Sequence, residues 1–352
     1  MPTKLLPNRA STDPPLPAPY RLALHPRTIA VIRLGRLGDV LLCTPTIRAL
    51  RNRFPDARLV VLTRYPALFA SLDDLTSGQI YSSLWSATRA LRALAPDLVV
   101  DLQRSAATAA LGRLSGAPVV LGARVHRWHD RLLTHAVPPQ RAYAAHYLGS
   151  ILRVLGVQQI NLDLHLRAPP APGPDLPAGA IGLAPGASSV TRAWPEARWI
   201  ALARQVRVHH PVVVIWGPPE AALAARVAAE AGVILAPPAD IPQMTAQIRQ
   251  LRLLVGNCSA PRHLAVSQRV PTVTLHGASP VGGWTRPTPW HVALHTDLAC
   301  RPCNQPTCPI GVRCLAEITE AQVLAAVEQV LLLGPEPGPL VVPIVPPTPP
   351  VT

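Results

Sequence analysis

The sequence TIAVIRLGRLGD, residues 28–39, indicates the architecture of the chain more clearly than any other stretch. Thr28–Leu34 is apolar almost throughout, which predicts a buried strand, and the glycines that follow permit a tight turn into a helix. Similar apolar runs alternate with helical patterns, and after the proline-rich stretch 167–179 the alternation starts again. Apolar strands that alternate with helices are typical of parallel sheets covered on both faces. The sequence therefore predicts an α/β protein with two Rossmann-like domains.

The predicted domain plan follows the distribution of proline. It comprises a proline-rich disordered tail (1–27), a first Rossmann-like domain (28–166), a proline-rich linker (167–179), a second Rossmann-like domain (180–333) that contains a cysteine-rich loop (300–314), and a proline-rich disordered tail (334–352). Ligands of open parallel sheets bind beyond the carboxyl ends of the strands. We therefore expect the loops after the strands to carry the chemistry.

The chain is strongly basic. Its 33 basic and 19 acidic residues give a formal net charge of +14, and Lys4 is the only lysine. This charge favours anionic partners such as phosphates, acidic glycolipids or a membrane surface, although a genomic preference for arginine gives the same composition. The arginines are scattered, and no helix-turn-helix, zinc-finger or RNP pattern is present, so nucleic acid is not an expected partner.

The N-terminal residues do not resemble a targeting segment. Residues 1–27 lack the apolar core of a signal peptide, and the sequence contains no uncharged apolar window of about 18 residues that would span a membrane. We therefore expect a cytoplasmic chain that at most touches a membrane surface.

The loop after the first predicted strand contains a candidate catalytic base. Gly35 and Gly38 allow a ligand to approach closely, and Asp39 stands at the edge where it can accept a proton from a ligand hydroxyl. The loop is neither a full dinucleotide fingerprint nor a Walker loop. The same pattern also fits an ordinary turn in which Asp39 caps a helix.

Residues 185–195, PGASSVTRAWP, follow the first strand of the second domain. Gly186, Ser188 and Ser189 suit phosphate oxygens, and Arg192 offers a positive charge to neutralise them. A surface loop that caps the following helix fits the pattern equally well.

Residues 256–263, GNCSAPRH, lie between a predicted strand and a predicted helix. Ser259 is expected to cap that helix, whose N-terminus would present free N–H groups and a positive dipole to a diphosphate. His263 lies in the first turn and could add to this binding. The alternative is a well-capped helix with an exposed histidine.

Four cysteines lie within 15 residues, at Cys300, Cys303, Cys308 and Cys314. This spacing can hold a tetrahedral structural metal, zinc or iron. Four protein ligands leave no open position, so a catalytic metal is not expected. The alternative is a loop of reduced, packed thiols, because a cytoplasmic chain does not keep disulfides.

Together these loops resemble glycosyltransferase family 9, the heptosyltransferase family of lipopolysaccharide core synthesis. The resemblance covers about residues 28–332 and is carried by five blocks in a fixed order: 29–63 (IAVIRLGRLGDVLLCTPTIRALRNRFPDARLVVLT), 97–105 (DLVVDLQRS), 182–199 (GLAPGASSVTRAWPEARW), 253–266 (LLVGNCSAPRHLAV) and 271–280 (PTVTLHGASP).

The resemblance implies a GT-B fold, in which the two parallel sheets face a central cleft. The first domain would hold the acceptor, a lipopolysaccharide core or another anionic glycan at the inner membrane, and the second the nucleotide-sugar donor, commonly ADP-heptose. The reaction would invert the anomeric centre without a catalytic metal. Asp39 would be the catalytic base, and Arg192 replaces the lysine usual in the family. The acceptor side would comprise Gly35, Arg36, Gly38 and Gln103.

Two positions of the implied donor site depart from the family pattern. Cys258 replaces an aspartate and Ala260 a glycine, beside Ser259 and His263. Each change would cost roughly 1–3 kcal/mol of donor binding if uncompensated. Two alternatives therefore stay open: a degenerate member that binds a nucleotide sugar without transferring it, and a GT-B nucleotide-sugar epimerase, whose expected cluster of carboxylates the sequence lacks.

Overall fold

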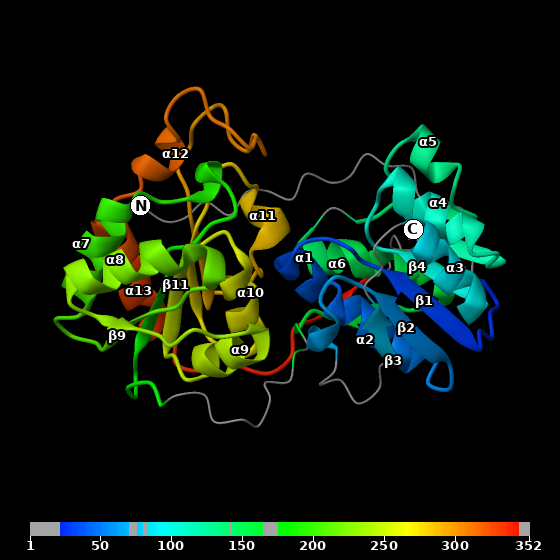
Figure 1. Ribbon diagram of the computed structural model, residues 1–352, viewed down its shortest axis with the longest axis horizontal. Helices are drawn as coiled ribbons and strands as arrows, with labels where there is room; N and C mark the ends of the chain where they lie inside the picture. The colour runs from blue at the N-terminus through cyan, green and yellow to red at the C-terminus, as the bar shows by residue number, and fades with distance from the viewer. Residues whose placement is uncertain are drawn as a thin grey trace, which may run out of the picture.

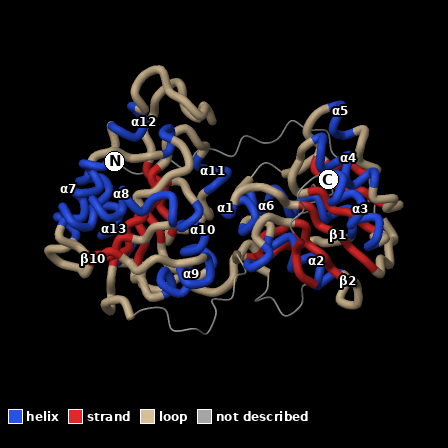
Figure 2. Tube along the Cα trace, viewed as in Figure 1, coloured by secondary structure: helices blue, strands red, loops and turns tan. Residues whose placement is uncertain are grey.

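The computed structural model describes residues 22–69, 76–79, 84–140, 142–164, 166 and 175–344. These residues form two α/β bodies that lie side by side, the first at the right and the second at the left of the view (Figure 1). Each body contains a six-stranded parallel sheet with helices packed around it (Figure 2).

The first sheet has the strand order β3-β2-β1-β4-β5-β6, with every strand parallel to its neighbours. Its central strands β1 and β4 are buried almost throughout, which explains why their sequences are continuously apolar. The strands are β1 (Thr28–Ile32), β2 (Arg58–Leu62), β3 (Thr76–Gln79), β4 (Leu98–Asp101), β5 (Val119–Ala123) and β6 (His135–Val137).

Helices cover both faces of the first sheet. Alternate residues of β1 point to opposite faces, so Val31 packs in the cluster with α2 and α6, and Ile32 in the cluster with α3 and α4. The helices are α1 (Leu37–Leu41), α2 (Thr44–Arg53), α3 (Leu84–Leu94), α4 (Ala106–Leu114), α5 (Arg127–Asp130) and α6 (Ala144–Gly149).

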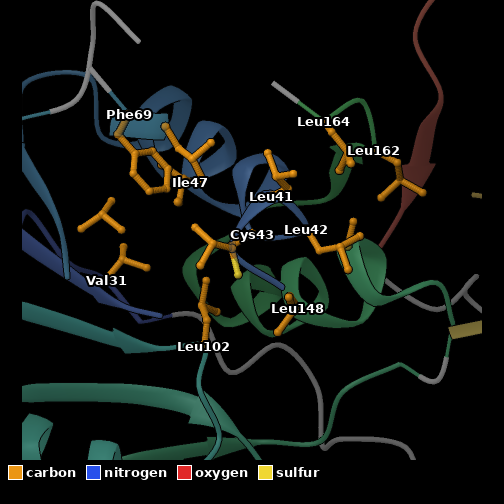
Figure 3. Packing of buried hydrophobic residues seen from close by; sticks show 14 of the residues in the cluster. Val31, Leu41, Leu42, Cys43, Ile47, Phe69, Leu102, Leu148, Leu162 and Leu164 are labelled. Atoms are coloured by element: carbon orange, nitrogen blue, oxygen red, sulfur yellow. The ribbon is translucent and has the colours of Figure 1, made fainter. Parts of the chain in front are cut away.

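The apolar cluster beneath α1 anchors the loop that carries Asp39. Figure 3 shows Leu41, Leu42 and Cys43 in this interior together with Leu102, and all four side chains are buried. Burial raises the pKa of the Cys43 thiol to about 11, so Cys43 stays neutral and packs as a small apolar side chain. The C-terminal end of α1 is therefore fixed by packing against the apolar interior.

The second sheet repeats the topology of the first, in the order β10-β9-β8-β11-β12-β13, again with all strands parallel. Its strands are β8 (Ile181–Ala184), β9 (Val212–Val214), β10 (Ile234–Leu235), β11 (Leu253–Asn257), β12 (Thr272–Leu275) and β13 (His291–Leu294). Both sheets thus have the doubly wound order in which ligands bind at the carboxyl edge. The predicted α/β fold with two Rossmann-like domains is confirmed.

The helices of the second domain are α7 (Glu196–Val206), α8 (Ala221–Ala231), α9 (Ile241–Arg249), α10 (Ala260–Ser267), α11 (Val281–Trp284), α12 (Arg313–Ala316) and α13 (Glu320–Leu331). Helix α10 continues from β11 and faces the first domain, where it packs against α1 (Figure 1). No helix in the described part of the chain is both long and apolar enough to cross a membrane.

The C-terminal segment is more ordered than the sequence predicts. Instead of a disordered tail from residue 334, β14 (Val341–Pro343) pairs antiparallel with β7 (Gln159–Asn161) of the first domain, and the Ile344 side chain is fully buried. Figure 1 shows this red segment returning from the second domain to the first. The prediction relied on the many prolines of this segment. It was wrong because the segment also contains a short apolar run, and an edge strand tolerates Pro343.

The other predicted tail and the linker lie only partly within the described residues. At the N-terminal end, the backbone N–H of Leu22 donates to the carbonyl of Val154 at 2.8 Å, and Leu24 packs against the core, so residues 22–27 are not a disordered tail. Residues 1–21, 167–174 and 345–352 lie outside the described residues.

Candidate active site

Asp39 lies in the first turn of α1, directly after β1. Its Oδ2 accepts a hydrogen bond from the backbone N–H of Arg36 at 3.1 Å, and its Oδ1 lies 3.3 Å from Nη2 of Arg33. Arg33 is buried and its Nη1 also donates to the carbonyl of Leu102 at 2.5 Å. Since Arg33 is held in this way, it fixes the orientation of the Asp39 carboxylate, which remains 23% exposed.

The loop around Asp39 depends on two predicted acceptor-side residues. A Cβ on Gly35 would lie 3.0 Å from Oδ2 of Asp39, so only glycine fits without displacing the carboxylate. Gln103, after β4, accepts a hydrogen bond from the backbone of Leu34 at 3.0 Å. Gln103 is held in turn by the buried carboxylate of Asp101, which accepts from its backbone N–H at 2.9 Å. Sequence analysis missed Asp101, although a carboxylate that ends an apolar strand was an available signal.

Two contacts bring the Asp39 loop against the second domain. Nη1 of Arg36 donates to Oγ of Ser188 at 2.6 Å. A Cβ on Gly38 would lie only 2.8 Å from Cδ2 of His263, so α1 and α10 are in close contact. The structure thus unites predicted residues of both domains at one place.

His263 is buried rather than exposed at this contact. Its Nε2 lies 3.2 Å from Nη2 of Arg262, and its ring meets that of Trp284 edge to face. Burial and then the charge of Arg262 hold the pKa of His263 well below its usual range. His263 is therefore neutral near pH 7 and packs between the domains, so it adds no positive charge to the diphosphate site that the sequence suggested, and it is not the exposed histidine of the alternative.

Asn257, at the end of β11, fastens the loop that follows β8. Its side chain is fully buried; Nδ2 donates to the carbonyl of Pro185 at 2.7 Å, and Oδ1 accepts from the backbone N–H of Trp194 at 3.1 Å. Both ends of the predicted phosphate-binding loop are thus tied to one amide. Sequence analysis did not select Asn257 as a site residue.

Glu220 is a further residue that sequence analysis did not select. It packs against Gly186, where an added Cβ would lie 2.5 Å from Cγ of Glu220. Its carboxylate accepts a hydrogen bond from the backbone N–H of Gly217 at 3.2 Å. Burial raises the pKa of Glu220 above its usual value. A half-buried carboxylate after the second strand of a Rossmann-like sheet is placed to accept hydrogen bonds from ribose hydroxyls.

The predicted phosphate ligands of the 185–195 loop differ in their availability. Ser189 is engaged within the protein, because its hydroxyl lies 2.8 Å from Oγ1 of Thr191 and 3.3 Å from the carbonyl of Pro306. Arg192 is partly exposed, and its guanidinium forms no hydrogen bond or ion pair with any other residue that the structure describes. Arg192 can therefore bind an anionic ligand without breaking an existing pair.

The start of α10 offers further polar groups. Ser259 occupies the N-cap position, and its buried hydroxyl has no hydrogen-bond partner among the described residues. Ala260 is the first residue of the helix, and Cys258 is buried beside it. The unpaired hydroxyl and the free N–H groups of the first turn form a potential anion site.

The cysteine-rich loop packs against the Ser188–Arg192 segment. Cys300 is exposed, Cys303 and Cys308 are partly buried, Cys314 is buried, and none of them forms a disulfide. Across the described residues, which include this entire loop, no three His, Cys, Asp or Glu side chains are grouped as a metal site requires. The cysteine-rich loop is held instead by hydrogen bonds to the 185–195 loop. One of them is donated by Oγ1 of Thr191 to the carbonyl of Gln305 at 2.8 Å.

A groove of about 400 Å³ lies on the first domain between α2 and β7. It is lined by Pro45, Arg48, Ala49, Asn52, Arg53, Val157, Gln159, Ile160 and Asn161. None of these residues is acidic, and none belongs to the loops that meet around Asp39. The groove is therefore separate from the candidate active site.

Comparison with known proteins agrees with this geometry. Residues 84–312, well over half of the chain, match the model of glycosyltransferase family 9 (heptosyltransferase). Lipopolysaccharide heptosyltransferase 3 of Escherichia coli is 26% identical over 287 residues, which cover 72% of this chain and 83% of that protein.

Two solved structures share the fold. A family 9 glycosyltransferase from Veillonella parvula DSM 2008 superposes with a TM-score of 0.70 at 21% identity, over 89% of this chain and 99% of that one. The E. coli ADP-heptose lipopolysaccharide heptosyltransferase II gives a TM-score of 0.68 at 17% identity, over 87% of this chain and 98% of that one. The family match includes both donor-side loops but begins after Asp39, so the position of Asp39 rests on the geometry above. The chain belongs to glycosyltransferase family 9, the heptosyltransferase family, and is a glycosyltransferase.

Proposed function

We propose that this enzyme transfers a sugar, heptose from ADP-heptose, to a lipopolysaccharide core or another anionic glycan, with inversion and without a catalytic metal. The observation that carries the proposal is the meeting of the Asp39 loop with the donor-side loops, through the 2.6 Å contact of Arg36 with Ser188. The names of the relatives, which include lipopolysaccharide heptosyltransferase 3 of E. coli, support the choice of sugar and pathway.

Asp39 acts as the general base. Its partly exposed carboxylate takes the proton of an acceptor hydroxyl while the hydroxyl oxygen forms a bond to the anomeric carbon of the donor. The bond from that carbon to the diphosphate oxygen breaks on the opposite face, and ADP leaves with its electron pair. Arg33 holds one carboxylate oxygen at 3.3 Å, so the carboxylate is oriented before the acceptor arrives.

The second domain stabilises the leaving diphosphate. The unpaired guanidinium of Arg192, the hydroxyl of Ser259 and the N-terminus of α10 supply positive charge and hydrogen-bond donors. Glu220 accepts hydrogen bonds from the ribose of the nucleotide, as an acidic residue does at this position of a dinucleotide-binding sheet. In this assignment, protein groups compensate the charge of the diphosphate.

Arginines follow two strands of the acceptor domain at the same edge as Asp39. Arg64 comes after β2 and Arg104 after β4. Guanidinium groups bind carboxylates and phosphates in a bidentate manner, which suits an anionic acceptor. We place the enzyme at the cytoplasmic face of the inner membrane, where a lipid-borne acceptor of this kind is exposed.

Replacement of Asp39 tests the assignment of the base. Asp39→Asn should lower kcat by about 10²–10⁴-fold, because the amide cannot take the proton. The donor dissociation constant, measured by calorimetry with ADP-heptose, should stay unchanged. Unchanged turnover in this variant would refute the role of Asp39.

Calorimetry also distinguishes transfer from binding alone. An enzyme should bind one class of nucleotide sugar among ADP-, GDP- and UDP-sugars and consume it when acceptor is added. Binding without consumption would favour the degenerate binder, for which the replacement of the usual family residues by Cys258 and Ala260 is the reason.

The four-cysteine loop stays a candidate for a structural zinc or iron ion. Its thiols are not grouped as ligands, so binding would require the loop to rearrange. Elemental analysis of the native protein should give one equivalent of metal per chain if the proposal holds, and a content far below one would reject it.

A further inference from the structure

The segment after β5 presents an unusual combination of exposed side chains. Residues 124–131, RVHRWHDR, include the short helix α5, and we call them the α5 tip. Arg124, Val125, His126, Arg127 and Trp128 are exposed in succession, Trp128 by 72% and Val125 by 44%. Large exposed apolar side chains flanked by cations mark contact sites for a partner or a membrane.

The α5 tip is held in place from below. His129 is fully buried; its Nδ1 lies 3.0 Å from Oδ1 of Asp130, and its Nε2 lies 3.7 Å from Oδ2 of Asp101. Oδ1 of Asp130 also accepts the backbone N–H of Val125 at 2.9 Å. The exposed residues are therefore displayed by a fixed scaffold, and little conformational entropy is lost when they bind.

The charges of the α5 tip select the kind of partner. The arginines of the α5 tip, Arg124, Arg127 and Arg131, favour a partner with an anionic surface. The carboxylate of Asp130 faces inward toward His129 and does not oppose this charge. The Arg131 guanidinium lies 5.2 Å from the centre of the Trp128 ring, so cation and aromatic ring form one unit. Tryptophan and arginine side by side suit the interface of a bilayer, where the ring enters the headgroup layer and the guanidinium binds phosphate.

The position of the α5 tip agrees with such a contact. It follows the carboxyl end of β5, and Asp39 follows the carboxyl end of β1 in the same parallel sheet. Figure 1 shows α5 at the top of the acceptor domain, above α4 and away from α1, which contacts the second domain. Helix α3, which packs on α4 as α4 does on α5, adds a second tryptophan, Trp85, with an exposure of 77%.

We propose that the α5 tip docks the enzyme on an anionic phospholipid surface, with Trp128 and Val125 inserted among the headgroups and Arg124, Arg127 and Arg131 bound to phosphates. The proposal rests on the lipid-borne acceptor of the proposed function, but its test does not depend on transfer. Docking by this tip brings the acceptor edge of the first sheet to the membrane and leaves the donor domain in solution.

Vesicle binding tests the proposal directly. The full chain is mixed with phosphatidylcholine vesicles that contain or lack phosphatidylglycerol, and binding is followed by co-sedimentation and by quenching of tryptophan fluorescence with brominated lipid. Binding should require phosphatidylglycerol and weaken as salt rises. Trp128→Ala should lower partitioning about tenfold, and Arg124→Ala and Arg127→Ala about fivefold each.

A matched control comes from the second domain. Leu332 is 87% exposed and Arg249 is also exposed, so Leu332→Ala/Arg249→Ala removes the same kinds of group away from the α5 tip. This variant should bind vesicles like the wild type, and all variants should keep the wild-type Tm because the changed side chains are exposed.

The outcomes separate docking from catalysis. Equal loss in the control and α5-tip variants, or no binding to phosphatidylglycerol vesicles by a chain that still transfers sugar to a soluble glycan, would overturn the docking proposal and leave the proposed function intact. The latter result would indicate a protein partner for the α5 tip. Vesicle binding that depends on Trp128, in a chain that consumes no nucleotide sugar, would support docking and refute the proposed transfer.

Discussion

At the scale of single residues, the acceptor side depends on the pair formed by Arg33 and Asp39. Arg33 joins the carboxylate to the carbonyl of Leu102, so the side chain acts as a positioning residue beneath the base. Arg33→Met keeps most of the volume and removes both polar contacts. We expect kcat to fall roughly tenfold to a hundredfold, because a misplaced base reacts slowly.

Kinetic measurements on Arg33→Met test whether Arg33 positions the Asp39 carboxylate. Steady-state kinetics should show the loss in kcat with little change in the KM for the donor, and Arg33→Lys should recover part of the rate. A variant that keeps the wild-type kcat would show that Asp39 is oriented without Arg33.

Arg192 offers a second prediction at this scale. Its guanidinium is free among the described residues, so Arg192→Ala should lower kcat/KM by about 10²–10³-fold through lost stabilisation of the diphosphate. Arg192→Lys, which restores the residue usual in the family, should retain most of the activity. Arg198→Ala is the control, since Arg198 pairs with Glu320 at 2.7 Å and should affect activity little. Equal effects of the two alanine variants would count against a role for Arg192.

Several contacts of the site could not be predicted from the sequence because they join residues that are far apart in the chain. The link between Gln103 and Leu34 spans 69 positions, and that between Asn257 and Pro185 spans 72. Asp39 and Ser188 were predicted from the loops that follow the first strand of each domain. The burial of His263 was not predictable, because part of its cover comes from the first domain, through Gly38.

At the scale of elements, the C-terminal segment connects the domains through buried charges. Glu336 accepts a hydrogen bond from Nε of Arg286 at 3.1 Å, and Nη2 of Arg286 donates to Asp163 of the first domain at 2.6 Å. The other carboxylate oxygen of Glu336 lies 3.3 Å from Nε2 of His291. The cluster holds β14 and β7 together at the junction of the domains.

Glu336→Gln should lower the free energy of unfolding by about 1–3 kcal/mol, because Arg286 loses the negative charge of one of its two carboxylate partners. Glu328→Gln serves as the control, since Glu328 lies on the exposed face of α13. Chemical denaturation of both variants checks the prediction, which fails if they are equally stable.

The same cluster predicts how stability depends on pH. Burial alone would raise the pKa of Glu336, but the hydrogen bond and charge of His291 and the charge of Arg286 outweigh it and lower this pKa. The pKa of Asp163 is likewise lowered against the effect of burial by Arg286. A carboxyl with a depressed pKa stabilises the fold above its unfolded pKa, about 4, and loses that contribution as the pH falls through the folded pKa.

Thermal unfolding between about pH 7 and pH 3 tests this dependence. The Tm difference between wild type and Glu336→Gln should be full near neutrality and shrink as Glu336 becomes protonated in acid. A difference that stays constant over this range would show that the Glu336 charge does not contribute to stability.

The sequence predicts the elements better where they are long and buried. Strand β1 lies within the predicted run 28–34, and four of its five residues are buried. The three-residue strand β6 and the two-stranded pair of β7 with β14 were not predicted, because short, half-exposed strands gain their stability from a neighbour that is remote in sequence.

At the scale of the whole molecule, the approach of the two domains depends on the absence of a side chain at Gly38. A Cβ there would lie 2.8 Å from His263, whereas a Cβ on Gly282 would meet nothing within 4 Å. Gly38→Ala should therefore keep α1 and α10 apart and lower kcat/KM, while Gly282→Ala should be neutral. Because alanine favours helix formation, both variants should fold, and a Gly38→Ala enzyme with full activity would show that this contact is not part of the active state.

The pairing of β14 with β7 has a mechanical consequence for the way in which the two domains approach each other. Among the described residues, β7 ends the first domain and pairs with β14, which lies on the segment that returns from the second domain. Two connections that lie close together allow the domains to rotate about the line that joins the connections. They resist twisting and sliding of one domain against the other. The enzyme should thus open and close along a single angular coordinate, and the Asp39 loop should return to the same register with the donor loops in every turnover.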